Sequence, residues 1–76
     1  MINLKGQRIF IAGGSRGLGR AAALMAAEAG ADVAISYISD GSAAQEVVKR
    51  IEGMGRKALA FKADVVSEKD ATAAID

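Results

Sequence analysis

The segment from residue 13 to residue 19 constrains the fold of this chain more than any other, because its sequence is GGSRGLG. It follows an almost continuous apolar run at residues 8–12, which is typical of a strand buried on both faces of a parallel sheet. It opens into residues 18–29, where Ala, Leu, Met and Glu favour an α-helix. The glycine-rich segment is therefore predicted to be a tight turn between a buried strand and a helix.

The rest of the chain repeats this order of strand and helix. Residues 32–37 and 57–63 predict two more strands, since both are rich in β-forming or apolar side chains. Ser42 with Gln45 three residues later matches a capping box, which predicts that a second helix starts there. The apolar side chains of this helix recur at helical spacing and are expected to face the core: Ala44, Val47, Val48 and Ile51.

Two further residues indicate where helices end or begin. Gly30 is suited to the left-handed position after the first helix, and Ser67, with Asp70 following, is the expected N-cap of a third helix. The resulting order β-α-β-α-β-α has connections long enough for parallel crossovers. The sequence therefore predicts an α/β fold, a parallel sheet with flanking helices, in which residues 1–76 form one domain with no second domain.

Composition narrows the possible functions. Of the 76 residues, 51% are hydrophobic and 25% are charged, a balance typical of globular rather than disordered chains. The net charge of +1 gives no reason to expect nucleic acid or an acidic membrane as a partner. There is no Cys and no His, so the commonest metal ligands are missing and no metal site is expected. The N-terminus does not resemble a signal peptide, and we expect a cytoplasmic protein.

The glycines of the turn have the roles that phosphate binding requires. Gly13 is expected to let the chain turn sharply, Gly17 to leave room for a pyrophosphate near the backbone, and Gly19 to let the helix pack close to the sheet. The free N–H groups around Leu18 and Gly19 would then point at the phosphates, with the helix dipole behind them. The alternative is a glycine-rich turn that binds nothing.

The spacing of the glycines also resembles a known family signature. Residues 12–19, AGGSRGLG, look like the T-G-x-x-x-G-x-G signature of the short-chain dehydrogenase/reductase family, with Ala12 in place of the usual Thr. The segments 4–6 and 63–65 also resemble the family, so the likeness covers almost the whole chain, and it is closest to 3-oxoacyl-[acyl-carrier-protein] reductase-like members. The resemblance implies a Rossmann-type sheet, with only the first βαβαβ half present, that binds a nicotinamide dinucleotide.

The end of the second strand bears on the choice of cofactor. Domains that select NAD usually carry an acid there, whereas this chain has Ser36 and Tyr37. Arg16 is a candidate partner of the NADP 2′-phosphate, a contact worth about 1.5–3 kcal/mol, so NADP(H) is favoured over NAD(H). Two alternatives stay open: Arg16 is a solvated surface charge, or Asp40 reaches the ribose and favours NAD.

The resemblance extends this site, and it implies that Asp64 and the backbone of Val65 contact the adenine. A loop or pre-helical role for Asp64 is an equal alternative. The full set of expected cofactor-binding residues is Gly13, Ser15, Arg16, Gly17, Leu18, Gly19, Ser36, Tyr37, Ser39, Asp64 and Val65.

The residues that would carry the family's chemistry are not found. The resemblance implies hydride transfer between NADP(H) and a carbonyl or alcohol substrate by a homo-oligomer, using a Tyr with a Lys four residues later. The only Tyr is Tyr37, and Gly41 stands four residues later, so no catalytic residue is predicted. Three hypotheses follow: the nucleotide-binding part of an NADP-dependent oxidoreductase, a non-catalytic dinucleotide-binding module, and a different Rossmann-like binder such as an S-adenosylmethionine-dependent methyltransferase.

Overall fold

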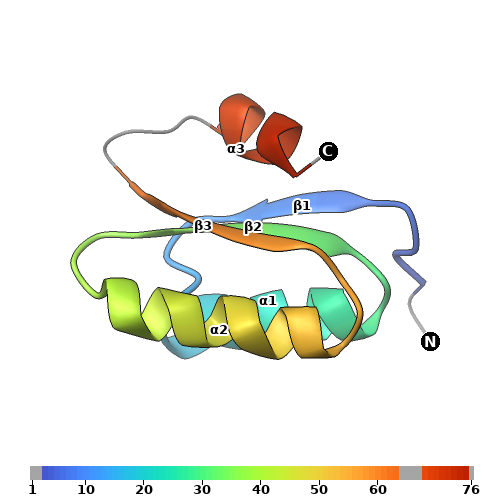
Figure 1. The fold of residues 1–76 in the computed structure, drawn as a ribbon, viewed down its shortest axis with the longest axis horizontal. Coiled ribbons are helices and arrows are strands. Elements are labelled where there is room, and N and C mark those ends of the chain that lie inside the picture. The colour runs from blue at the N-terminus through green and yellow to red at the C-terminus, as the bar shows by residue number, and fades with distance from the viewer. Residues whose placement is uncertain (1–2, 64–67, 76) are drawn as a thin grey trace.

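The fold is a three-stranded parallel sheet with helices on both faces (Figure 1), given by a computed structural model that describes residues 3–63 and 68–75. The strands are β1 (Arg8–Ile11), β2 (Asp32–Tyr37) and β3 (Ala58–Lys62), which lie in the order β1-β2-β3. Both pairings are parallel, as predicted. All three strands lie where the apolar runs predicted them, within one residue at each end.

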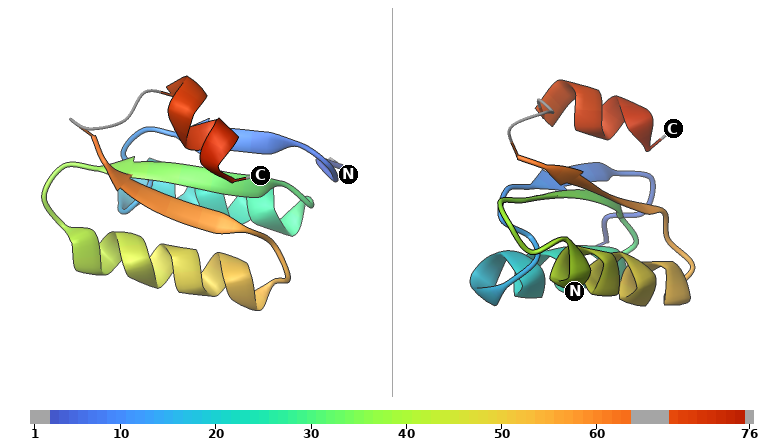
Figure 2. Two further views of the ribbon diagram at one scale, coloured as in Figure 1. Left: turned by 45° about the horizontal axis from the view of Figure 1, so that its top comes forward. Right: turned by 60° about the vertical axis from the view of Figure 1, so that its left-hand side comes forward.

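The helices alternate with the strands along the chain. They are α1 (Gly17–Glu28), α2 (Gly41–Gly53) and α3 (Glu68–Ala74). Helices α1 and α2 cover one face of the sheet, and α3 lies across the other face (Figures 1 and 2). The chain thus has three layers, with the sheet between the α1–α2 pair and α3.

Strand β2 supplies the centre of both cores because its side chains alternate between the two faces. Val33 and Ile35 are fully buried against α1 and α2, in the larger core. Ala34 points the other way and packs with Ala71 and Ile75 of the α3 side. The four α2 residues expected in the core are all buried there: Ala44, Val47, Val48 and Ile51.

The predicted start of α2 is wrong by two residues. The helix begins at Gly41, and its N-cap is Asp40, whose side chain accepts a hydrogen bond from the Ala43 amide at 3.0 Å. Ser42 and Gln45 therefore lie inside the helix rather than forming a capping box at its end. Asp and Ser are equally good N-caps, so two capping residues two positions apart leave the sequence ambiguous here.

Glycine ends α1 as predicted. Gly30 has φ of +110°, the region that residues with a Cβ avoid. A Cβ there would also lie only 2.9 Å from the Lys5 amide nitrogen. The segment before β1 is anchored in the same place, because the Leu4 amide donates to the Ala29 carbonyl at 2.7 Å. Gly30 thus lets the chain leave α1 and pass in close contact with the backbone of Lys5 in the N-terminal segment.

The third helix is present, but its expected N-cap, Ser67, lies outside the described residues. Among the described residues, no helix has the length and apolar character needed to cross a membrane.

The larger core should dominate stability. Replacing Ile51, which is fully buried, with Ala should lower the free energy of unfolding by about 2–5 kcal/mol, because methyl groups are lost and a cavity remains. The matched control is Ile38→Ala, which deletes the same atoms from a side chain that is 80% exposed and should cost far less. Urea denaturation of both variants measures the difference, and equal losses would contradict this account of the core.

Candidate functional site

The glycine-rich turn connects β1 to α1 at the carboxyl end of the sheet, where two of its residues have a left-handed backbone. Gly13 has φ of +71° and Gly17 has φ of +58°. Among the described residues, no atom outside the turn lies within 4 Å of the position that a Cβ would occupy on either residue. Backbone conformation rather than crowding therefore requires glycine at both positions. The sharp turn predicted at Gly13 is confirmed, and the space beside Gly17 is open.

The other two glycines of the turn are required by close packing. A Cβ on Gly14 would lie 2.5 Å from the Ile35 side chain in the middle of β2. A Cβ on Gly19 would overlap the carbonyl oxygen of Gly13. Gly19 therefore packs closely, as predicted, but against the turn at Gly13 and Gly14 rather than against a strand. Gly14, for which no packing role was predicted, packs on β2.

Ser36, near the end of β2, holds the glycine-rich turn in place through hydrogen bonds. Its side chain is 4% exposed, and its hydroxyl accepts a hydrogen bond from the Gly13 amide at 3.2 Å. Its carbonyl accepts from the Gly14 amide at 3.1 Å. One residue thus holds both amides of the Gly13-Gly14 pair. The structure gives Ser36 a supporting contact to the turn, and a direct contact with a cofactor stays a prediction.

The N-terminus of α1 emerges from this turn without a side-chain cap. Arg16 occupies the N-cap position with an extended backbone, and its side chain makes no capping hydrogen bond. The first turn of α1 carries no acidic residue. The first amides of a helix have no acceptor within the helix, so those of Gly17, Leu18 and Gly19 are donors available to an anion. The Leu18 side chain lies beside them and is 91% exposed.

The Arg16 side chain reaches from the N-terminal end of α1 (residues 16–19, the mouth of α1) to the start of α2. Its Nη2 donates to Oδ2 of Asp40, and the two side chains are 74% and 31% exposed. The hydrogen bond from Arg16 lowers the pKa of the Asp40 carboxyl from its usual value, and the amide of Ala43 acts in the same direction. Asp40 is therefore charged at neutral pH. Arg16 is thus an exposed side chain that pairs with Asp40, and the binding of a ribose by Asp40 stays an alternative.

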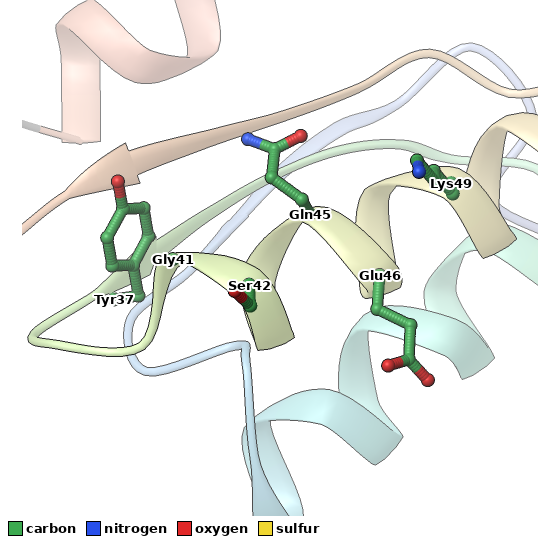
Figure 3. Close-up of a pocket in the computed structure, with 6 residues that line it drawn as sticks. All are labelled: Tyr37, Gly41, Ser42, Gln45, Glu46 and Lys49. Atoms are coloured by element: carbon green, nitrogen blue, oxygen red, sulfur yellow. The ribbon is translucent and has the colours of Figure 1, made fainter.

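Tyr37 is the last residue of β2, and Ser39 lies in the loop between β2 and the N-cap of α2. Ser39 is exposed, and the ring of Tyr37 lies over Gly41, 3.6 Å from where a Cβ would be. Figure 3 shows an open hollow beside this ring, along the outer side of α2. The hollow is lined by Tyr37, Gly41, Ser42, Gln45, Glu46 and Lys49. The glycine turn does not line it, so the hollow and the mouth of α1 are separate features.

The remaining predicted site residues divide into two groups. Ser15 is half-buried within the turn, beside Arg16. Asp64 and Val65 lie outside the described residues, so their predicted contact with adenine stays a prediction. The structure therefore brings Gly13, Ser15, Arg16, Gly17, Leu18, Gly19 and Ser36 together at one strand end, with Tyr37 and Ser39 at its margin.

A parallel sheet with helices on both faces, whose first strand leads through a glycine turn into an uncapped helix, defines the Rossmann class of α/β domains. Within that class, the chain belongs to the short-chain dehydrogenase family, because the family described as "short chain dehydrogenase" matches residues 7–76.

Similar proteins agree with this family. The chain is 46% identical over 68 residues to an L-rhamnose 1-dehydrogenase (NAD(P)(+)) of Sphingomonas sp. (strain SKA58), covering 90% of this chain and 27% of that protein. It is 47% identical over 64 residues to an L-rhamnose 1-dehydrogenase (NADP(+)) of Thermoplasma acidophilum, covering 84% of this chain and 25% of that protein.

A solved structure shares the fold as well as the sequence. A short chain dehydrogenase from Burkholderia cenocepacia J2315, solved in complex with NADP, superposes with a TM-score of 0.80 and 50% sequence identity. The superposition covers 82% of this chain and 25% of that one. The chain thus spans about a quarter of the length of the proteins it matches.

The packing of the turn makes one substitution diagnostic. Gly19→Ala should destabilise the protein by about 1–3 kcal/mol, since the new Cβ meets backbone that cannot move without distorting the turn. The control is Gly53→Ala, also in a helix but with open space around it, which should be neutral or stabilise by up to about 1 kcal/mol. Thermal unfolding of both variants checks this, and a Gly19→Ala protein as stable as the control would refute the close contact.

Proposed function

We propose that this chain is the NADP(H)-binding portion of a short-chain dehydrogenase/reductase that transfers hydride between NADP(H) and a carbonyl or alcohol substrate. The observation that carries the proposal is the mouth of α1, where uncapped amides, a glycine turn and the Arg16 cation lie together. The N-terminal end of a helix that has neither a side-chain cap nor nearby acidic residues is suited to bind an anion, since both its free N–H groups and the helix dipole favour negative charge.

The pyrophosphate of the dinucleotide fits this mouth. The amides of Leu18 and Gly19 would donate to its oxygens, and the open space beside Gly17 leaves room for it to approach the backbone. Gly13 and Gly14 are held to Ser36 by hydrogen bonds, so the turn is preorganised before a ligand arrives. Preorganisation of this kind lowers the entropic cost of binding.

The 2′-phosphate of NADP would be bound by Arg16. No acid stands at Ser36 or Tyr37, where NAD-selective Rossmann domains place the carboxylate that binds the ribose. A charged hydrogen bond between guanidinium and phosphate contributes about 1.5–3 kcal/mol, which corresponds to about a 10–150-fold preference for NADP(H). The Thermoplasma relative, which is named for NADP(+), and the Burkholderia structure, which was solved with NADP, support the same choice, whereas the Sphingomonas relative is named for both cofactors.

The other predicted residues have secondary roles in this proposal. Ser15 would lie next to the pyrophosphate in the turn, and Ser39 or the Tyr37 hydroxyl would complete the pocket of the 2′-phosphate. Asp64 and Val65 would contact the adenine. Ser36 acts mainly through the turn that it holds in place.

The dinucleotide, when bound, would donate or accept the hydride, and the role of this chain is to bind and orient the dinucleotide. We assign no catalytic residue to the chain, because Tyr37 lacks a Lys four residues later and lies beside α2 rather than at the mouth of α1. We propose that the catalytic residues belong to the part of the family fold that this chain does not match, and that the chain alone is inactive. A cytoplasmic location and a homo-oligomeric state stay predictions. The particular likeness to 3-oxoacyl-[acyl-carrier-protein] reductase-like members also stays a prediction, since the relatives above are named for another substrate, L-rhamnose.

Arg16→Ala tests the cofactor assignment. In the intact protein that carries this chain, the substitution should weaken NADPH by about 10–150-fold and NADH by far less, since only NADPH has the 2′-phosphate. The dissociation constants are measured by the fluorescence of the reduced nicotinamide, which needs no substrate.

The control for this experiment is Arg50→Ala, which removes a cation from the last turn of α2, at the opposite end of that helix from Asp40. It should leave both dissociation constants unchanged. Equal weakening of NADPH and NADH by Arg16→Ala would show that Arg16 does not bind the 2′-phosphate. Tight NADPH binding without any hydride transfer would favour the non-catalytic module instead.

A further inference from the structure

The contact between Arg16 and Asp40 occupies the cation that the proposed function assigns to the 2′-phosphate. We propose that Asp40 acts as an internal counter-anion, which the 2′-phosphate must displace from Arg16, and that it thereby limits how strongly the site prefers NADPH over NADH. This inference rests on the proposed function, and it identifies Asp40 as a residue that determines cofactor specificity.

Asp40 is held in a fixed position rather than free to move aside. Its Oδ1 accepts the Ala43 amide at 3.0 Å, which makes it the N-cap of α2, while its Oδ2 accepts from Nη2 of Arg16. The two oxygens therefore have different partners. A carboxylate fixed by a helix cap stays beside Arg16 even when the guanidinium turns toward a ligand.

Arg16, by contrast, is the more exposed partner. Its side chain is 74% exposed, against 31% for Asp40. A guanidinium has five N–H donors in a planar fork, and it binds phosphate best with two of them in parallel. With Asp40 already accepting from one NH₂ group, a phosphate must either replace the carboxylate or share the fork with a second anion. Both arrangements reduce the net gain from binding the 2′-phosphate.

The helix cap does not require the negative charge of Asp40. Asn caps helices about as well as Asp, since only a side-chain oxygen is needed to accept the amide hydrogen bond. The substitution Asp40→Asn therefore removes the charge facing Arg16 and retains the cap of α2. Function can be separated from stability at this one position.

A second ion pair between the same two helices provides a matched control. Nη2 of Arg20 lies 3.6 Å from Oε1 of Glu46, and these side chains are 38% and 67% exposed. Glu46→Gln removes one negative charge from α2, as Asp40→Asn does from its N-cap, but it leaves the Arg16 contact intact. Any effect of overall charge on nucleotide binding would appear in both variants.

The experiment measures dissociation constants for NADPH and NADH in the intact protein and in four variants: Asp40→Asn, Arg16→Ala, the double variant, and Glu46→Gln. Asp40→Asn should bind NADPH about two- to fivefold more tightly, which is the range expected when an exposed ion pair no longer competes, and NADH should change little. In the Arg16→Ala background, Asp40→Asn should have no effect on NADPH, because its influence passes through Arg16. Glu46→Gln should leave the ratio of the two constants unchanged.

Two results would overturn the inference alone. If Arg16→Ala weakens NADPH selectively but Asp40→Asn leaves the NADPH-to-NADH ratio unchanged, Asp40 does not compete for Arg16. If Asp40→Asn strengthens NADPH binding equally in the Arg16→Ala background, the carboxylate repels the phosphate directly and the ion pair is irrelevant. Failure of the proposed function would give a different result. The protein would then bind neither nucleotide, or Arg16→Ala would weaken the binding of NADPH and NADH by the same factor. Should Asp40→Asn not fold, Asp40→Ser retains a capping oxygen and takes its place.

Discussion

The attachment of the glycine turn to the end of β2 is the contact on which the site depends. Gly14 can lie on the Ile35 side chain only because it has no Cβ, and Ser36 accepts hydrogen bonds from the amides of both Gly13 and Gly14. This attachment brings the start of α1 to the carboxyl end of the sheet. The uncapped amides of α1 therefore stand at a fixed place, where a ligand can meet them without first ordering the loop.

Charge at this strand end is arranged so that the cation belongs to the turn and the anion to the next helix. Arg16 lies within the glycine turn of the first crossover, and Asp40 caps the second helix, 24 residues away in the sequence. Parallel crossovers bring both residues to the same edge of the sheet, because each helix starts there. An ion pair between the two helix starts thus follows from the topology, and its sensitivity to a third charge follows from its exposure.

The apolar runs and the alternation of strand and helix patterns are enough to predict the strands and their parallel order. The buried face of α2 is also predictable, since apolar residues such as Val47 and Ile51 recur at the helical spacing that places them on one face. These patterns are not enough to decide between Asp40 and Ser42 as the N-cap, because both residue types accept the same hydrogen bond. The positive φ of Gly13 was predictable from the turn, whereas the packing of Gly14 on Ile35 was not. That contact depends on how far the turn folds back over β2, which no local pattern specifies.

Binding of the dinucleotide phosphates by the amides at the start of α1 can be seen in a crystal structure of the intact protein with NADPH. We expect pyrophosphate oxygens within about 2.7–3.2 Å of the Leu18 and Gly19 amides, with Ser36 still holding the turn. If NADPH is bound with its pyrophosphate away from those amides, or if the chain itself covers them, the start of α1 is not the phosphate-binding site.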